Sequence, residues 1–246
     1  MGIDMKIYAV GLGPGEISGM TGRALEVLRE SQVIVGYELY INLLGPLVEG
    51  KEVITTPMKR EAERCKMAVD LALGGKTVAM VSSGDAGVYG MAGVLHEVAA
   101  DYPQLSIEVI PGITAACSAA AVLGAPLTHD FAVISLSDLL TPWEKIETRL
   151  KNAAQADFVI CLYNPASKKR ADYLGRACAA VMEYIDGDTP CGYVRNIGRD
   201  GQGYEILTLK ELAVLKADMF TTVIIGNSTT KVIGGKLVTP RGYRGV

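Results

Sequence analysis

The chain lacks the features that mark several common classes of protein. Its 246 residues include 24 basic and 27 acidic side chains, so no net positive charge favours binding to nucleic acid or to an anionic membrane. Its five cysteines contain no CxxC pair, and this scatter gives no sign of a structural metal or a disulfide framework. We therefore expect no metal site, no nucleic-acid partner and a location in the reducing cytoplasm.

Long apolar runs are also missing. One uncharged stretch, 109–128, has about the length that crosses a bilayer, but two prolines and two glycines interrupt it. The apolar segment 5–10 is too short for a secretory leader and runs directly into a turn. We expect a globular protein without a membrane partner.

Cys117, Cys161 and Cys178 have apolar or alanine-rich surroundings and are expected to be small buried thiols.

Short apolar runs alternate with segments of helical spacing along the whole chain, which predicts an α/β fold. The segment 124–128 reads as a linker, and we predict two consecutive α/β domains, 1–124 and 125–246. Strands are expected at 6–10, 33–35, 53–54, 77–81, 105–110, 131–136, 158–163, 191–194, 204–207 and 221–225, with a closing hairpin at 231–238. Helices are expected at 21–31, 61–73, 88–100, 113–123, 143–153 and 167–184, with irregular helix at 37–47.

Small and polar residues gather where the predicted strands end. The loop with Gly84 and Asp85 holds one acid among small residues, which suits a backbone that lies close to a bound molecule. Because ligands of open α/β sheets bind beyond the carboxyl edge, we expect a ligand cleft between the two domains, lined by these loops. The other loops are Pro111-Gly112-Ile113-Thr114, Tyr163-Asn164-Pro165, Arg195-Asn196-Ile197-Gly198 and Gly226-Asn227-Ser228-Thr229.

The first glycine loop, 11–15, allows a second interpretation as a dinucleotide-binding turn. Glu38, after the second predicted strand, would then bind the ribose. The spacing is GxGxG, however, and Pro14 removes an amide donor where a pyrophosphate would need one. A nicotinamide-dependent reductase is therefore an alternative that rests on this loop alone.

Basic residues follow two of the predicted strands, 158–163 and 191–194. Lys168, Lys169 and Arg170 fall in the expected first turn of a helix, where cations oppose the helix dipole unless an anion binds there. Together with Arg195 they suggest a ligand rich in carboxylates, and the alternative is a solvated surface cluster.

His129 and Asp138 flank the first predicted strand of the second half, and both residue types can move protons. His129 is one of only two histidines and lies beside the predicted linker. It is a candidate catalytic residue or a packing residue, and Asp138 is a second catalytic candidate or a helix cap.

Four motifs, in this order and spacing, resemble those of the tetrapyrrole methylases. Four longer stretches, 83–92, 134–143, 163–170 and 226–230, are similar to the branch that methylates a corrinoid precursor at carbon 17 with ring contraction, in cobalamin biosynthesis. The resemblance covers nearly the whole chain. The four motifs are Gly11-Leu12-Gly13-Pro14-Gly15, Gly84-Asp85, Pro111-Gly112-Ile113-Thr114 and Gly226-Asn227.

The resemblance implies two α/β domains with S-adenosylmethionine bound between them, S-adenosylhomocysteine as product, and a homodimer. It implies a tetrapyrrole substrate, precorrin-3B or cobalt-factor III, whose own carbon is the nucleophile. His129 and Asp138 would assist ring contraction, and Lys168, Lys169, Arg170 and Arg195 would bind substrate carboxylates. The residues carried over as cofactor contacts are Pro14, Gly84, Asp85, Val88, Tyr89, Thr114, Ala115, Leu162, Tyr163, Asn227 and Ser228.

Three alternatives stay open at this point. A tetrapyrrole methylase could act at another ring position, because the cofactor loops are shared within the family. The reductase rests on the first glycine loop. A non-catalytic module that binds an adenosyl ligand would satisfy the loops around Asp85 equally well.

Overall fold

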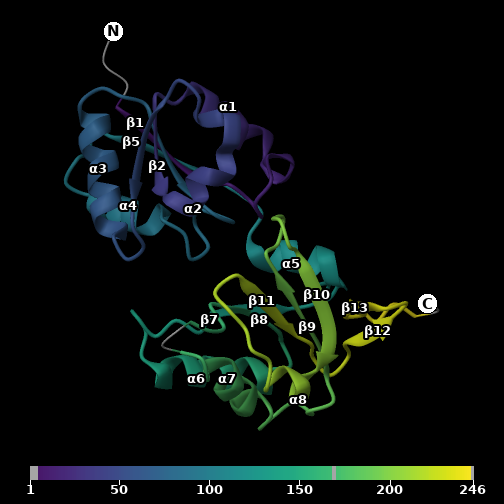
Figure 1. Cartoon of the computed structure of the whole chain (residues 1–246). Coiled ribbons are helices and arrows are strands. Elements are labelled where there is room, and N and C mark those ends of the chain that lie inside the picture. Colours follow the sequence, from purple (N-terminus) through teal and green to yellow (C-terminus); the bar gives the residue numbers. More distant parts are fainter. Residues whose placement is uncertain (1–4, 168–169, 245–246) are drawn as a thin grey trace. The chain divides into compact units, whose positions relative to one another are not determined.

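The computed structural model describes residues 5–167 and 170–244 and divides the chain into two compact units, Met1–Ala115 and Ala116–Val246 (Figure 1). The division falls at the start of helix α5 (Ala115–Leu123), whereas the sequence places the boundary at its end. Its buried residues, among them Ala116 and Leu123, pack in a core of the second unit, which explains the difference. Within the described ranges, no helix is both long and apolar enough to cross a bilayer.

The first unit contains a five-stranded sheet in the order β3-β2-β4-β1-β5, and every pair of neighbours is parallel. All five strands therefore end at one edge, which we call the carboxyl edge of this unit. Three adjacent strands, β4, β1 and β5, place three loops side by side there. The strands are β1 (Lys6–Gly11), β2 (Val33–Tyr37), β3 (Glu52–Thr56), β4 (Val78–Ser82) and β5 (Ser106–Ile110).

Alternate residues of these strands enter two cores, one on each face of the sheet. Ile7, Ala9 and Met80 pack with α3 and α4, while Val10 and Val81 pack with α1 and the segment after β2. The unit is therefore a three-layer α/β/α arrangement (Figure 1). Its helical elements are η1 (Ile17–Gly19), α1 (Gly22–Glu30), α2 (Glu38–Ile41), η2 (Asn42–Val48), α3 (Glu61–Leu73) and α4 (Ala92–Val98).

The second unit contains a mixed sheet in the order β10-β9-β11-β8-β7. Strands β7 and β8 are parallel, and β11 runs antiparallel to both of its neighbours, β8 and β9. Strands β7, β8 and β9 therefore end at one edge, and β10 and β11 end at the opposite one. The strands are β7 (Phe131–Ser135), β8 (Val159–Tyr163), β9 (Pro190–Arg195), β10 (Gly203–Thr208) and β11 (Thr221–Ile225).

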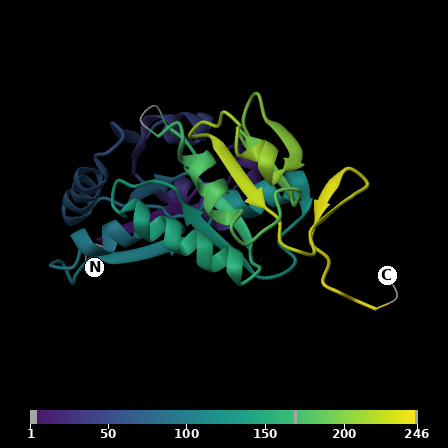
Figure 2. The same ribbon diagram turned by 90° about the horizontal axis from the view of Figure 1, so that it is seen from below.

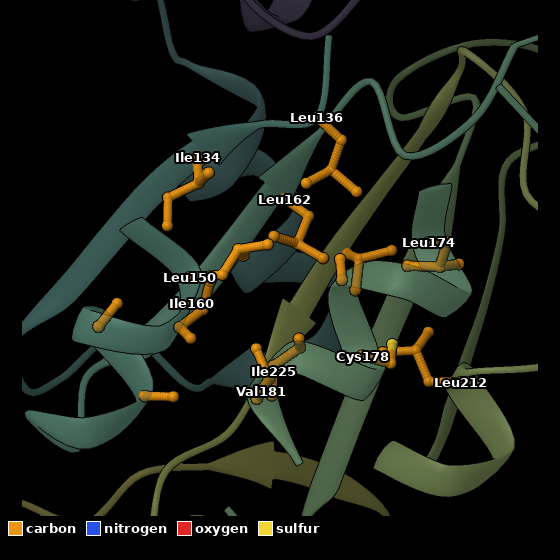
Figure 3. Packing of buried hydrophobic residues seen from close by; sticks show 14 of the residues in the cluster. Ile134, Leu136, Leu150, Ile160, Leu162, Leu174, Cys178, Val181, Leu212 and Ile225 are labelled. Carbon is orange, nitrogen blue, oxygen red and sulfur yellow. The ribbon is translucent and has the colours of Figure 1, made fainter. Parts of the chain in front are cut away.

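Helices cover both faces of this sheet as well. On one face α6 (Trp143–Gln155), α7 (Tyr173–Val181) and α8 (Leu209–Leu212) bury the larger core, which includes Leu150, Leu162 and Val181 (Figure 3). On the other face α5 packs against Cys161 and Ile224. This packing makes the second unit α/β, as the sequence predicted.

The segment predicted as a linker is part of a second, smaller sheet. Gly124–Ala125 forms strand β6, which pairs in parallel with β13 (Lys236–Val238), the second arm of the closing hairpin (Figure 2, yellow). The first arm is β12 (Lys231–Ile233). The expectation of a linker at 124–125 is therefore wrong. Two residues carry no periodicity, so only the distant hairpin reveals them as a strand.

Helix starts and cysteine burial show two further differences. Helix α7 begins at Tyr173 and not at Ser167, so Arg170 lies in the loop before the helix and the dipole argument does not apply to it.

Cys161 and Cys178 are buried as predicted, and burial raises the pKa of each thiol to about 12. The prediction for Cys117 is wrong, because this residue lies on the exposed side of α5. Among alanines the sequence does not define which face of a helix is buried.

Candidate functional site

Four glycines bring the loops after β1, β4 and β5 into direct contact at the carboxyl edge of the first unit. A Cβ atom on Gly112 would lie 2.1 Å from the carbonyl oxygen of Gly84 and 2.6 Å from the carbonyl carbon of Gly11. Gly13 and Gly84 form an antiparallel bridge, with both N–H···O distances at 2.9 Å. Only residues without a side chain allow this approach, so glycine is required at the centre of the loop cluster.

The carboxylate of Asp85 ties the second of these loops to the third. Oδ1 accepts hydrogen bonds from the amides of Gly87 (2.8 Å) and Val88 (3.1 Å), and Oδ2 accepts one from the amide of Gly112 (3.0 Å). Both oxygens are therefore engaged by backbone donors, which stabilise the negative charge and fix the loop. Asp85 serves as a brace within the loop cluster.

The structure brings five of the predicted cofactor residues of this unit together around Gly84. The Cβ position at Gly84 lies 3.7 Å from Thr114 Cα and 3.7 Å from the Ala115 amide, with no nearer atom. Asp85 follows directly, and Pro14 follows the bridge at Gly13. The three nearest atoms to this position are all backbone atoms.

Val88 and Tyr89 lie at the outer side of the same loop, 38% and 59% exposed. Tyr89 has a φ of 53°, a left-handed conformation that is uncommon for an aromatic residue. The loop thus presents apolar side chains beside the backbone surface around Gly84.

In the second unit, Tyr163 and Asn164 occupy the edge at which β7, β8 and β9 end. The Tyr163 hydroxyl accepts a hydrogen bond from the Ala116 amide (2.7 Å), and the Asn164 side-chain amide donates to Ser135 Oγ (2.9 Å). Leu162 is fully buried in the larger core, so its side chain packs in the protein (Figure 3). Only its backbone faces the neighbouring strands.

Asn227 and Ser228 lie at the opposite edge, and the expectation that all strand-end loops share one edge is wrong for them. Strand β11 is antiparallel to β8, so its end meets the beginning of β8. The Asn227 side-chain amide donates to the Asp157 carbonyl (3.1 Å), and Ser228 Oγ donates to an Asp157 carboxylate oxygen (2.6 Å). These contacts close the turn before β8. Because Tyr163 is at the other end of β8, the length of this strand separates it from Asn227 and Ser228.

His129 and Asp138 are also at opposite edges. His129 precedes β7, is half exposed, and accepts a hydrogen bond from the Asp130 amide at Nδ1 (3.1 Å). Asp138 follows the same strand, whose five residues span roughly 16 Å. The structure therefore does not bring the two catalytic candidates together, because each belongs to a different end of β7.

Of the predicted basic residues, Arg170 and Arg195 lie at the edge where β8 and β9 end, and Lys168 and Lys169 lie outside the described residues. Arg170 donates from Nε to Ser167 Oγ (3.0 Å), and its Nη1 is 3.5 Å from Asp138 Oδ1. The Arg195 guanidinium donates to the Lys216 carbonyl and lies 5.2 Å from the ring of Tyr193.

The sequence predicted β11 at 221–225 but did not predict that the start of this strand lies at this same edge. Thr221 pairs with Arg195, and the Phe220 carbonyl accepts from the Asn196 amide (3.1 Å). Asn164 and Asn196 both have positive φ, 52° and 50°, at the turns that leave the edge. The alternation of side chains along a strand does not depend on the direction in which the strand runs. No local signal in the sequence could therefore have shown that the start of β11, and not its end, lies at this edge.

The alternative of a dinucleotide site finds little support in this geometry. In the sheet of the first unit β4 lies between β1 and β2, so Glu38 is not next to the first glycine loop as a dinucleotide site requires. Within residues 5–167 and 170–244, no group of three histidine, cysteine, aspartate or glutamate side chains could hold a metal ion.

Comparison with known proteins gives one consistent result. The model of the tetrapyrrole (corrin/porphyrin) methylases matches residues 6–213. A "probable cobalt-factor III C(17)-methyltransferase" of Salmonella typhimurium is 47% identical over 96% of this chain and 99% of its own length. A "precorrin-3B C(17)-methyltransferase" of Sinorhizobium sp is 38% identical and is covered to 97%, as is this chain.

Solved structures agree with these relatives. The crystal structure of the methyltransferase CobJ superposes with a TM-score of 0.88 and 36% identity, over 96% of this chain and 99% of that one.

Two further sequence relatives, at 44% and 45% identity, are longer proteins, and this chain spans 45% and 53% of their lengths.

Proposed function

The chain belongs to the tetrapyrrole methylase family, and we propose that it transfers a methyl group from S-adenosylmethionine to carbon 17 of a corrinoid precursor, with contraction of the macrocycle, in cobalamin biosynthesis. The substrate is precorrin-3B or cobalt-factor III, the compounds for which the two relatives are named. Identities of 38–47% over nearly the whole chain support this choice over another ring position.

The observation that carries the proposal is the side-chain-free surface around Gly84. Backbone atoms of Gly84, Thr114 and Ala115 surround a position that holds no side chain. Exposed apolar side chains, Val88 and Tyr89, border it. Such a surface fits a flat adenosyl group, which can approach the backbone closely and form hydrogen bonds to its amides and carbonyls.

The charge around this surface also fits the reaction. S-adenosylmethionine, when bound, supplies a methyl group on a positively charged sulfur. A free carboxylate beside that sulfur would stabilise the substrate state more than the transition state, in which the charge is being lost. The one acid of the loop, Asp85, has both oxygens occupied by backbone amides.

The loops of the first unit therefore bind and orient the methyl donor. Orientation of two reactants can supply a large part of the rate acceleration of a displacement, so no protein nucleophile is needed. Pro14, Gly84, Asp85, Val88, Tyr89, Thr114 and Ala115 stay in this proposal as cofactor residues. Tyr163, which belongs to the second unit, stays a prediction of the resemblance.

Asn227, Ser228 and His129 take no part in the proposed chemistry, because the contacts of all three lie at the other edge of their sheet. Arg170 and Arg195 bind substrate carboxylates. The homodimer, the cytoplasmic location and the cleft between the domains stay predictions of the resemblance.

The test is an incubation of the purified protein with S-adenosylmethionine and either metal-free precorrin-3B or cobalt-factor III. We expect the mass of one tetrapyrrole to rise by one methyl group, and its absorption spectrum to change as the ring contracts. Nuclear magnetic resonance of the product assigns the methylated carbon.

Other outcomes separate the alternatives. Binding of S-adenosylhomocysteine without methyl transfer to either tetrapyrrole would indicate a non-catalytic module. Binding of NAD(H) in place of S-adenosylhomocysteine would indicate a reductase, and a methyl group on another carbon would indicate a different member of the family.

A further inference from the structure

One cluster at the edge of the second unit where β7 and β8 end is not explained by cofactor binding. It combines Asp138 from the loop after β7, Trp143 from the first turn of α6, Arg170, and Tyr173 and Arg176 from α7. All five side chains belong to one unit, and nothing in the sequence motifs or the comparisons assigns a role to Tyr173 or Arg176.

Tyr173 connects the members of this cluster. Its hydroxyl donates a 2.6 Å hydrogen bond to Asp138 Oδ2, and its ring packs against Trp143 with centroids 4.6 Å apart. This hydrogen bond, together with burial, raises the pKa of the Tyr173 phenol, so the tyrosine keeps its proton. The Asp138 carboxylate is thus already engaged as the acceptor of this hydrogen bond.

Asp138 also faces the guanidinium of Arg170. Its Oδ1 lies 3.5 Å from Arg170 Nη1, while Ser167 Oγ accepts from Arg170 Nε at 3.0 Å. The side chain of Arg170 is only 16% exposed, and within the described residues its Nη1 has no hydrogen-bond partner. The guanidinium is thus oriented from two sides but still has donors without an acceptor.

A second guanidinium, that of Arg176, contacts the ring of the same tyrosine. The Arg176 guanidinium carbon is 4.1 Å from the Trp143 ring and 5.0 Å from the Tyr173 ring. Among the described residues Arg176 forms no salt bridge. The charge of Arg176 also acts on the Glu147 carboxylate, whose pKa is lowered chiefly by Lys151. Contact with two aromatic faces orients a planar cation, and a guanidinium held in this way can pair with a carboxylate of a ligand.

We propose that Arg170 and Arg176 together form a binding site for two side-chain carboxylates of the tetrapyrrole, and that Tyr173 is the positioning residue that holds both guanidinium groups. This inference rests on the proposed function for the identity of the ligand. The chemistry is that of guanidinium recognising carboxylate by paired hydrogen bonds. Asp138 acts through Arg170 and touches no reacting atom.

Kinetics with saturating S-adenosylmethionine test the proposal. Arg170→Gln and Arg176→Gln should each raise the KM for the tetrapyrrole roughly tenfold or more, since each removes a charge-assisted contact. The affinity for S-adenosylhomocysteine should stay unchanged. Arg176→Lys should recover part of the loss, because it restores the charge without the planar stack.

Tyr173→Phe keeps the ring and removes only the hydroxyl. It should raise the KM by a smaller factor than Arg170→Gln, and the double variant should lose less than the product of the two single effects, because the hydroxyl acts through Asp138 on Arg170. Arg149→Gln is the matched control and should behave as the unaltered protein. Arg149 is an exposed residue of α6 that forms no salt bridge with any residue in 5–167 or 170–244.

A second readout does not depend on turnover. Trp143 is the only tryptophan of the chain, so its fluorescence reports on this cluster directly. Uroporphyrin III, a polycarboxylate tetrapyrrole, should change that fluorescence in the unaltered protein and much less in Arg176→Gln at equal concentration.

The inference is overturned if both glutamine variants keep a KM within about twofold of the unaltered value and unchanged titration by uroporphyrin III. A fall in kcat alone would also overturn it, because binding would then be intact. If the unaltered protein transfers no methyl group, the proposed function fails, and the fluorescence titration still decides whether the cluster binds carboxylates.

Discussion

The two units of this molecule use similar residues after their strands but arrange them differently. In the first unit all strands are parallel, so glycine loops after β1, β4 and β5 meet at one edge and pack backbone against backbone. In the second unit β11 runs against its neighbours, and the loop with Asn227 closes the opposite edge. A glycine-containing loop at a strand end is therefore part of the candidate site in one unit and a structural turn in the other.

This difference has a simple geometric cause. Parallel strands need crossovers through helices, so each strand re-enters the sheet at the same edge and leaves it at the other. Antiparallel strands send alternate ends to opposite edges. Strand ends predict a site only after the direction of every strand is known.

The largest expected effect comes from an added methyl group at the centre of the first unit's loops. In Gly112→Ala the new Cβ would lie 2.1 Å from the Gly84 carbonyl oxygen, so a loop must move. We expect about 3 kcal/mol lower stability and loss of S-adenosylhomocysteine binding, measured by urea unfolding and calorimetric titration.

Gly226→Ala is the matched change in the second unit, with a Cβ 2.5 Å from the Pro190 carbonyl oxygen. It should lower stability to a similar degree and leave the affinity for S-adenosylhomocysteine intact. Gly93→Ala in α4, where a Cβ meets nothing within 4 Å, controls for the substitution itself. A weaker affinity in Gly226→Ala would show that the two loops serve one site after all.

Asp85→Asn is expected to have an intermediate effect. An amide cannot accept all three backbone hydrogen bonds, so at least one of the amides of Gly87, Val88 and Gly112 loses its partner. We expect a stability loss of about 1–3 kcal/mol and weaker binding of S-adenosylhomocysteine. The measurements are again urea unfolding and calorimetry.

Asp101→Asn removes an exposed charge of the same unit and should leave both quantities unchanged. If Asp85→Asn matched this control, the brace between the second and third loops would have no energetic role, and the contrast between the units would rest on the glycines alone.

The smallest effect concerns the boundary between the units and involves no substitution. Helix α5 packs in the second unit. Of the five cysteines, Cys117 on this helix is exposed and the other four are buried. Burial raises the pKa of Cys65 to about 11 and that of Cys161 to about 12, so these thiols are both shielded and protonated at pH 8.

A thiol reagent at pH 8 should therefore modify one cysteine quickly in the native protein and all five after unfolding in urea. Peptide mapping should locate the fast reaction at Cys117. Rapid modification of Cys161, which packs against α5, would show that the helix leaves this core in solution.

Much of the fold could be predicted from residues close in sequence. Apolar runs of strand length and segments such as 61–73 with a glycine stop mark most helices and strands, because side-chain periodicity and helix ends are local properties. Predictions failed where the cause is distant. Strand β6 exists only because the hairpin near the C-terminus pairs with it, and the start of α7 at Tyr173 was not marked by Ser167.

The sequence by itself determined the α/β architecture, the glycine loops of the first unit and the resemblance to the tetrapyrrole methylases, because these depend on spacing and residue type along the chain. The tertiary structure alone decided that Asn227 and His129 lie away from Tyr163, that backbone amides occupy the Asp85 carboxylate, and that Tyr173 joins Asp138 to Arg176. The physical reason is that strand direction and hydrogen-bond partners arise when distant segments pack, and no local pattern encodes which segments will meet.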